Sequence, residues 1–372
     1  MKIKSLTLRN YKQFLQERTF YFTENQQTDG EINDVTLLVG DNGSGKSSIL
    51  QAIAMVVGGA SRPFFSPVQL DEDFPGFQYK QIHSGKTALC VSAKITFLPD
   101  EIDATIEYTK RMQDLHPERR LELPQKNTEI ALRLDYENNK ILSDDSRQFF
   151  QARGYQYALQ LRNVTPNANA LLDRVGTIHW YTEQRNLTST FQPVHDDNTV
   201  TKVKNILFGN DDNPSTKMKT ILISWARFAQ DIQNKRIVIR EGQSNKYERL
   251  ADLYKRIFPG RSLSGPAPKD SPDNYEIEDF FLFDGKAEYE LGSMSGGERA
   301  IFPILVDFAN WNINNSIILI DEIELHLHPP LQYALLKALP KLGNNNQFII
   351  TTHSDYVVEA VDSNQIIRLD QP

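Results

Sequence analysis

The sequence predicts an α/β fold of the P-loop NTPase type, and three observations lead to it. Residues 40–47 read GDNGSGKS and match the pattern G-x-x-x-x-G-K-[ST] at every fixed position. A fully apolar run, VTLLV, precedes this loop at 35–39, and a helical pattern follows it. The last hundred residues alternate strand-like and helical segments, as in a parallel sheet covered by helices. We expect a mixed or parallel sheet, an antiparallel β subdomain and a helical insertion.

Length and composition limit the class of protein. The chain has 372 residues, a net charge of −7 and 40% hydrophobic residues, which is ordinary for a soluble globular protein. Such a length predicts one large domain with insertions, or two domains. The longest apolar runs fall far short of the ~20 residues that span a bilayer, and the N-terminal segment lacks the apolar core of a signal peptide. Cys90 is the only cysteine, which excludes intrachain disulfides and cysteine-rich zinc sites. We therefore expect a cytoplasmic protein with no membrane partner.

The N-terminal third reads as strands around one helix. Residues 2–22 alternate apolar and polar side chains in two blocks, which predicts a hairpin with its bend near Asn10–Gln13. The helix after the phosphate loop is expected to end at Gly58 and Gly59. Two further strands are predicted at 88–98 and 128–136, with a charged, helical excursion between them.

The rest of the chain mixes helices with buried strands. Residues 175–187 read as a strand that runs into a polar loop, 216–258 as mostly helical, and 259–274 as a flexible break rich in proline and glycine. The final alternation comprises strands at 276–283, 316–320 and 347–352 and helices at 296–311 and 330–341. We predict that these three strands belong to one parallel sheet.

The phosphate loop predicts a nucleotide site. Its glycines let backbone N–H groups converge on phosphates, and the following helix adds partial positive charge. Lys46 would reach the β- and γ-phosphates, and the Ser47 hydroxyl would ligate Mg²⁺. The alternative is a flexible glycine turn without a ligand. The predicted nucleotide contacts are Gly40, Asp41, Asn42, Gly43, Ser44, Gly45, Lys46, Ser47 and Ser48.

A pair of carboxylates ends the apolar strand at 316–320. A carboxylate at the end of a buried strand is unfavourable unless a cation is near, so Asp321 is expected to share Mg²⁺ with Ser47. Glu322 would then activate a water as general base. The alternative is that both residues only cap the next segment. His326 and His328 could instead suggest a metal site, but no third histidine or cysteine cluster supports it.

Two further segments complete the expected site. His353 follows the apolar strand 347–352, and the ends of parallel strands meet at one edge of a sheet, so His353 could contact the γ-phosphate. The segment SGGE, 295–298, begins a helix with Ser295 as the expected N-cap. If two copies meet head to tail, Ser295, Gly296, Gly297 and Glu298 of one copy can cover the γ-phosphate held by the other. The alternative for SGGE is an ordinary helix start.

These motifs together resemble a known group. The ordered set GDNGSGKS, LGSMSGGER, SIILIDE and TTHS is similar to the ABC-type ATPase heads of RecF, SMC and OLD proteins, over roughly 1–60 and 275–372. The resemblance implies ATP and Mg²⁺ as ligands and a homodimer that closes around ATP. It also places Asn10 near the base and ribose, and Gln184 at Mg²⁺ and the γ-phosphate, with Arg185 as the competing residue.

The same resemblance divides the chain into three parts. Residues 1–98 form the N-terminal part of the head, with the hairpin and phosphate loop. Residues 99–274 form an insertion with a β-hairpin, the Gln184 segment and a helical arm. Residues 275–372 form the C-terminal part, with the signature segment SGGE, the carboxylates and His353.

Two departures and one charged segment bear on function. Transporter ATPases usually follow the catalytic glutamate with proline and an aspartate-containing loop, whereas IELHLHP stands here, as in OLD-like and RecF-like ATPases of nucleic-acid processing or phage defence. Pro303 lies inside the helix after SGGE, where we expect a kink. Residues 235–261 carry eight basic and three acidic residues, a local balance of +5. This segment could contact DNA phosphates, or it could be a set of solvated helix faces.

We therefore expect an ATPase whose ATP-driven dimerisation controls nucleic-acid binding or a separately encoded effector, such as a nuclease or toxin. DNA repair and anti-phage defence are the expected settings. One alternative is the ATPase subunit of a membrane transporter. Another is a structural switch that binds ATP and hydrolyses it slowly.

Overall fold

The computed structural model describes residues 1–61, 79–85, 87–118, 121–126, 128–138, 140–144, 150–162, 164, 168–182, 214–239, 244–268 and 278–369. The chain forms two compact units. Unit 1 comprises residues 1–183, 312–325 and 339–372, and unit 2 comprises residues 184–311 and 326–338.

A parallel five-stranded sheet organises unit 1. Its strands, in spatial order, are β13 (Ile366–Arg368), β3 (Val35–Val39), β12 (Gln347–Thr352), β11 (Ile317–Ile320) and β7 (Ile178–Tyr181). All residues of β7, β11 and β12 are buried, as expected for strands covered on both faces. The predicted strands at 35–39, 316–320 and 347–352 are confirmed.

A second sheet of unit 1 is antiparallel. Its strands, in spatial order, are β2 (Arg18–Tyr21), β1 (Lys2–Arg9), β4 (Cys90–Thr96), β5 (Glu129–Asp135) and β6 (Lys140–Ser143). The predicted N-terminal hairpin is confirmed, because Ser5 pairs with Tyr21 and Leu8 with Arg18. The antiparallel β subdomain expected from the sequence is therefore present.

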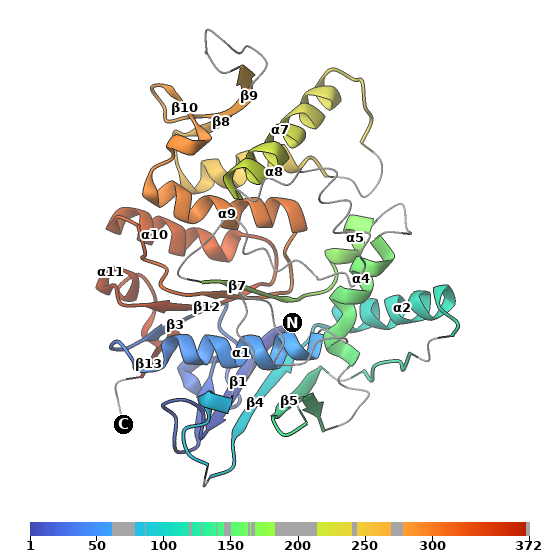
Figure 1. Ribbon diagram of the computed structural model, residues 1–372, viewed down its shortest axis with the longest axis vertical. Coiled ribbons are helices and arrows are strands. Elements are labelled where there is room, and N and C mark those ends of the chain that lie inside the picture. The colour runs from blue at the N-terminus through green and yellow to red at the C-terminus, as the bar shows by residue number, and fades with distance from the viewer. Residues whose placement is uncertain are drawn as a thin grey trace. The chain divides into compact units, whose positions relative to one another are not determined.

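Helix α1 (Lys46–Ser61) lies between the two sheets of unit 1 (Figure 1). Nearly all of its residues are buried, which explains why its sequence is apolar on every side. The prediction that Gly58 and Gly59 end this helix is wrong, since α1 continues to Ser61 and both glycines are buried. Packing on two sides outweighs the ~1 kcal/mol by which glycine disfavours a helix.

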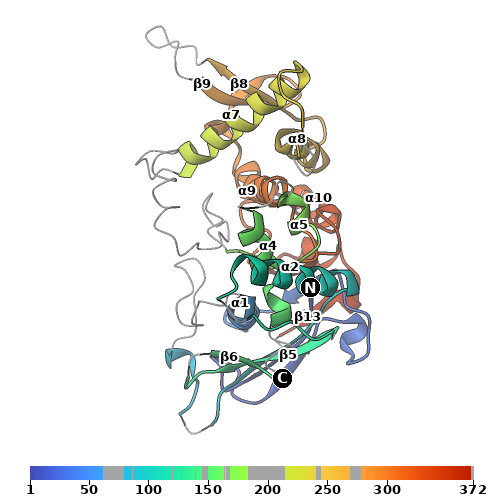
Figure 2. The same cartoon turned by 90° about the vertical axis from the view of Figure 1, so that its right-hand side faces the viewer.

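Three further helices of unit 1 pack on one another. Helix α2 (Pro99–Leu115) begins with proline at its first turn and packs against α4 (Gly154–Arg162), as Figure 2 shows. The Tyr108 hydroxyl of α2 donates to the Leu171 carbonyl of α5 (Ala168–Leu172) at 2.9 Å. The helical excursion after β4 is thus confirmed. Shorter helical segments in the chain are α11 (Asp355–Val358), η1 (Glu24–Gln26), η2 (Tyr79–Gln81), η3 (Phe150–Arg153), η4 (Leu291–Ser293), η5 (Leu339–Lys341) and η6 (Ser363–Gln365).

Unit 2 combines helices with a three-stranded antiparallel sheet of order β10-β9-β8. Helix α7 lies against β8 and β9, and α8 packs against α9. The elements are α7 (Pro214–Gln233), α8 (Lys246–Ile257), β8 (Ser262–Pro268), β9 (Glu278–Phe283), β10 (Glu288–Glu290), α9 (Gly296–Trp311) and α10 (Pro329–Ala338).

Unit 2 corrects several sequence-based expectations. The predicted break at 259–274 contains β8, which pairs with β9. This strand tolerates two prolines because it lies at the edge of its sheet, where a missing N–H breaks no ladder bond. The strand predicted at 276–283 belongs to this antiparallel sheet and not to the parallel one. The predicted helix at 296–311 is confirmed, and α9 continues through Pro303.

Candidate active site

The predicted functional segments of unit 1 follow neighbouring parallel strands. In the sheet, β12 lies between β3 and β11, and Val39 pairs with Thr352 while Ile320 pairs with Ile350. The carboxyl ends of parallel strands meet at one edge of a sheet, where open α/β folds bind ligands. The phosphate loop, the Asp321–Glu322 pair and His353 therefore emerge from the same edge.

The phosphate loop owes its shape to glycine. Gly43 and Gly45 adopt φ values of 83° and 109°, which favour glycine strongly. A Cβ at Gly45 would lie 2.1 Å from Gln13 Nε2 and 2.6 Å from Phe14 Cζ, so the bend of the N-terminal hairpin packs directly on the loop. Gln13 also accepts a hydrogen bond from the Ser48 hydroxyl at 3.2 Å. Sequence reasoning did not predict Gln13, although its place in the hairpin bend was predicted.

Lys46 and Ser44 place polar groups in this loop. The buried Lys46 ammonium donates to the carbonyls of Gly40 and Asp41 at 2.8 and 3.0 Å. The Ser44 hydroxyl is buried and has no hydrogen-bond partner within the described part of the chain. A tight glycine loop with a cation and an unsatisfied hydroxyl fits the oxygens of a triphosphate.

Asp321 and Ser47 form the expected pair for a divalent cation. The Ser47 hydroxyl donates to Asp321 Oδ1 at 3.1 Å, and Thr351 Oγ1 donates to the same oxygen at 2.5 Å. Over the described ranges there is no cluster of three or more His, Cys, Asp or Glu side chains. A hydroxyl and one carboxylate fit Mg²⁺, which keeps waters and takes phosphate oxygens as its other ligands. The metal interpretation of His326 and His328 accordingly finds no third ligand there.

Glu322 turns the chain sharply after β11. Its φ of 47° lies in the left-handed region, which is unfavourable by ~1–2 kcal/mol for a residue with a side chain. Two hydrogen bonds to Thr351 hold this turn: Glu322 N–H donates to Oγ1 at 2.8 Å and Ile323 N–H to the carbonyl at 3.2 Å. Thr351 therefore orients both carboxylate residues. Sequence reasoning did not predict Thr351, although a hydroxyl residue near the end of a buried strand was a signal for it.

His353 is exposed beyond β12, and a carboxylate fixes its backbone. Its N–H donates to Glu324 Oε1 at 2.5 Å, and the next N–H, of Ser354, donates to Thr352 Oγ1 at 3.0 Å. The segment after β11 is thereby tied to the segment after β12. Sequence reasoning did not predict Glu324.

The Asn10 side chain binds residues 84–87 of unit 1. Asn10 is fully buried, and its amide nitrogen donates to the carbonyls of Ser84 and Thr87 while its oxygen accepts from Ser84 N–H at 2.6 Å. Its amide holds a neighbouring loop of unit 1, and its predicted contact with a base or ribose stays a prediction. Lys12 and Gln13 follow Asn10 in the hairpin bend, and Gln13 packs on the phosphate loop. Burial lowers the pKa of Lys12, and the nearby charge of Lys80 lowers it further. The predicted residues Gln184 and Arg185 lie outside the described residues.

The signature segment lies in unit 2 as a capped helix start. The Ser295 hydroxyl accepts from Glu298 N–H at 3.3 Å, and Glu298 Oε2 accepts from Ser295 N–H at 3.0 Å. This reciprocal pair is a capping box, so the predicted N-cap is observed. Ser295 and Gly296 are exposed, whereas Glu298 is buried.

Three side chains surround the Glu298 carboxylate. Its Oε1 accepts from the Tyr254 hydroxyl at 2.7 Å, from Arg261 Nη1 at 2.5 Å and from the Tyr289 hydroxyl. Burial opposes ionisation, but these donors and Ser295 N–H together lower the pKa of Glu298 to about 2. Both the N–H and the carboxylate of Glu298 thus bind within unit 2, and its predicted contact with a nucleotide stays a prediction.

Much of the basic segment 235–261 has partners inside unit 2. Lys246 donates to Asn310 at 2.6 Å, Arg249 to the Phe308 carbonyl at 3.2 Å, and Arg261 pairs with Glu298. Arg236 pairs with Asp231 at 3.5 Å. These contacts favour a structural role for half of the eight basic residues.

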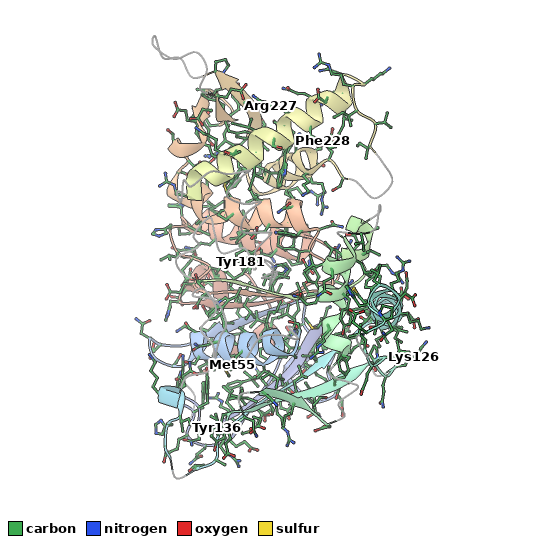
Figure 3. The ribbon with its side chains drawn as sticks, turned by 45° about the vertical axis from the view of Figure 1, so that its right-hand side comes forward. Met55, Lys126, Tyr136, Tyr181, Arg227 and Phe228 are labelled. Carbon is green, nitrogen blue, oxygen red and sulfur yellow. The ribbon has the colours of Figure 1, made fainter. Side chains whose placement is uncertain are left out.

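An open depression in unit 2 has a different character from the phosphate loop. Arg227 and Phe228, labelled on α7 in Figure 3, line its volume of about 440 Å³. The depression also contains Asp231 and Glu278, and Glu278 pairs with Arg227. Because Arg227 is paired and two carboxylates line the depression, it does not suit a phosphate.

No helix in the described ranges is long and apolar enough to cross a bilayer.

Comparison with known proteins assigns the family. Residues 1–358 match the family described as AAA ATPase domain, so the chain belongs to that family and is an ATPase. It is 22% identical over 402 residues to the Retron Vc95 probable ATPase of Vibrio cholerae serotype O1 biovar El Tor, covering 98% of this chain and 73% of that protein. It is 42% identical over 84 residues to the Retron Ec83 probable ATPase of Escherichia coli, covering 20% of this chain and 16% of that protein.

One solved structure supports the fold. An SMC head bound to the C-winged helix domain of ScpA matches with a TM-score of 0.50 and 16% identity, covering 99% of this chain and 94% of that chain. The predicted ABC-ATPase-like fold, with its parallel and antiparallel sheets, is confirmed.

Proposed function

We propose that this ATPase of the AAA ATPase domain family hydrolyses ATP between two copies placed head to tail. One observation carries the proposal: the groups suited to a triphosphate form two sets. The phosphate loop, Asp321, Glu322 and His353 belong to unit 1, whereas the SGGE segment, with Ser295 and Gly296 exposed, belongs to unit 2. In the proposed dimer there are two sites. Each copy supplies its unit 1 set to one site and its unit 2 set to the other.

The set in unit 1 binds ATP and Mg²⁺ and activates the attacking water. Lys46 and the loop N–H groups hold the β- and γ-phosphates, and Ser47 and Asp321 hold Mg²⁺. When bound, Mg²⁺ neutralises charge on the phosphate oxygens. Glu322 accepts a proton from the attacking water, and the exposed His353 donates a hydrogen bond to the γ-phosphate. Thr351 keeps Asp321 and Glu322 in register through its hydroxyl.

The set in unit 2 caps the γ-phosphate of the other copy. The first N–H groups of α9 have no acceptor within the helix, and the helix start carries partial positive charge. Ser295 and Gly296 are exposed and can meet a second copy. ATP then acts as a bridge between two heads, and loss of the γ-phosphate releases them.

The dimer would control a partner, and a protein effector fits better than DNA. Two relatives are named as ATPases of retrons, which supports a role beside other components in anti-phage defence. DNA binding by residues 235–261 has less support, because four of their basic side chains already have partners. A nuclease or toxin encoded separately is the proposed effector class.

The Glu322→Gln variant tests the dimer. Removing the general base should lower kcat by ~10²–10⁴-fold and leave ATP bound, so dimer should accumulate with ATP and Mg²⁺. Light scattering after size exclusion measures the mass, with the exposed Glu17→Gln as control. A monomer at every ATP concentration would refute the head-to-tail scheme. Equal turnover of wild type and Glu322→Gln would remove Glu322 from catalysis and favour a slow structural switch.

The trapped Glu322→Gln dimer also tests the partner. We expect it to bind a co-expressed candidate effector more tightly than the nucleotide-free protein does, with little affinity for a short DNA duplex at physiological salt. Strong, salt-sensitive binding of the duplex would instead favour DNA as the partner.

A further inference from the structure

We propose that Arg261 and Tyr254 are positioning residues for the SGGE segment: by anchoring Glu298, which holds the Ser295 N–H, they set the direction of the Ser295 hydroxyl that caps the γ-phosphate. This inference rests on the proposed function, because it assumes that Ser295 meets a triphosphate.

The Glu298 carboxylate works as a bridge with two ends. Within the described residues, Oε1 accepts from side chains of distant segments, namely Tyr254 of α8, Tyr289 of β10 and Arg261 between α8 and β8. Oε2 accepts from Ser295, through its N–H at 3.0 Å and its hydroxyl at 2.8 Å. One oxygen is therefore fixed by the tertiary structure, and the other directs the loop.

An ordinary capping box needs no such anchor. On a solvated helix the glutamate reaches back to the N-cap N–H, and water satisfies its other oxygen. Here the Glu298 side chain is 3% exposed, so its second oxygen must find donors inside the protein. Arg261 supplies a charged donor that is itself 35% exposed. The bonds around Oε1 keep the buried carboxylate ionised and also fix its orientation.

The anchor also affects how readily Ser295 can engage phosphate. A serine hydroxyl has one proton, and in this structure Ser295 donates it to Glu298 Oε2. A γ-phosphate must take that proton over. Arg261 and the tyrosines draw charge toward Oε1, which makes Oε2 a weaker competitor for the hydroxyl. Without Arg261, the carboxylate would hold the Ser295 proton more strongly and the loop would lose its anchor.

The Arg261→Met variant tests this role. Loading of ATP on a single head depends on unit 1 and should change by less than ~2-fold, whereas kcat and the ATP-dependent dimer should fall by ~10- to 100-fold, as for loss of a charged hydrogen bond. Lys286→Met, an exposed change in the β9–β10 turn, is the matched control. Arg261→Lys should recover part of kcat, since it restores the charge but not the fixed donor geometry.

Two readouts separate positioning from loss of structure. Glu298→Gln removes the charge that Arg261 contacts, so Arg261→Met should add little to its defect in a double-mutant cycle. Mixing Arg261→Met with Lys46→Ala should raise turnover above that of either variant alone. In the mixed dimer, the first supplies an intact phosphate loop and the second an intact Ser295.

The outcomes also distinguish this inference from the proposed function. Normal kcat and normal dimer formation in both Arg261→Met and Tyr254→Phe would overturn the inference, while the wild-type dimer would still stand. If Arg261→Met does not fold, Tyr254→Phe decides alone, because it removes only a hydroxyl, which contacts Glu298 and Tyr289. A wild-type protein that never dimerises with ATP would overturn the proposed function itself.

Discussion

The phosphate loop of unit 1 and the SGGE segment of unit 2 are both glycine-rich helix starts, but they are held in different ways. The phosphate loop follows a buried parallel strand, and its shape depends on backbone torsions at Gly43 and Gly45. The SGGE segment depends on one buried carboxylate, Glu298, and the side chains that surround it. The first geometry is set by the backbone, and the second by side-chain hydrogen bonds.

This difference has physical consequences. A backbone-set loop is sensitive to a Cβ in the wrong place and is insensitive to pH. A loop set by an ionised carboxylate is sensitive to single polar substitutions and to acid. Four experiments can break or sharpen this comparison.

The largest expected effect belongs to Lys46→Ala. Removing the ammonium that meets the triphosphate should lower kcat/KM by ~10³-fold or more, because its charge acts where the phosphate charge develops. Stability should change by about 1 kcal/mol, the usual net contribution of a hydrogen bond, since Lys46 donates to two carbonyls of its own loop. Binding of a fluorescent ATP analogue and thermal melting measure the two effects, with the exposed Lys94→Ala as control. Normal analogue binding would contradict the assignment of the loop.

The second effect is the acid sensitivity of unit 2. The pKa of Glu298 is about 2 against an ordinary 4.5, so its ionised form contributes about 3 kcal/mol to stability. Because the folded pKa is the lower one, this contribution is present above pH ~4.5 and is lost as the pH falls toward ~2. Urea unfolding of wild type and Glu298→Gln at pH 7, 4 and 3 should show a difference that shrinks with acid. A difference that stays constant, as expected for the exposed Glu288→Gln, would refute the anchored carboxylate.

The third effect concerns the backbone of the phosphate loop. Both Gly45→Ala and Gly43→Ala place a Cβ at a positive φ, but only position 45 meets Gln13 and Phe14 within 3 Å. We expect Gly45→Ala to be less stable than Gly43→Ala by ~1–3 kcal/mol, measured by denaturant unfolding. Equal stability of the two variants would mean that the hairpin bend yields easily and does not brace the loop.

The smallest expected effect is that of Thr351→Val. This change keeps the shape of the side chain and removes the hydroxyl that serves Asp321 and Glu322, so kcat should fall by ~10-fold with little change in ATP affinity. Thr36→Val in β3 is a matched control, because the buried Thr36 hydroxyl has no partner in the described part of the chain. A kcat unchanged by Thr351→Val would show that the strand ends alone orient the carboxylates.

Most of the site in unit 1 could be predicted from sequence, because its residues lie directly after predicted strands. The phosphate loop and Asp321 were placed by local pattern, and the Ser47–Asp321 contact followed from the Mg²⁺ that the two residues were expected to share. Gln13, Thr351 and Glu324 were missed, since each acts on a residue distant in the chain. Asn10 was placed at the nucleotide by resemblance, and its buried contacts with residues 84–87 were not visible in the sequence.

The errors in the predicted fold have similar causes. An apolar, alternating pattern predicted β9 as a strand, but nothing local shows which sheet a strand joins. The prolines of β8 argued for a loop, and only its place at a sheet edge makes them acceptable. Gly58 and Gly59 signalled a helix end, and packing between two sheets overrode that signal.

By itself the sequence determined the nucleotide chemistry of this protein, because a glycine loop, a lysine and a strand-end carboxylate carry their roles in short, contiguous patterns. The tertiary structure alone decided how Glu298 is held: Tyr254, Arg261 and Tyr289 are dispersed over α8, a loop and β10, and each must fold into place before the carboxylate can be buried with its charge. Local torsions are encoded within a few residues. A buried charge is stable only where segments distant in the chain bring their donors together.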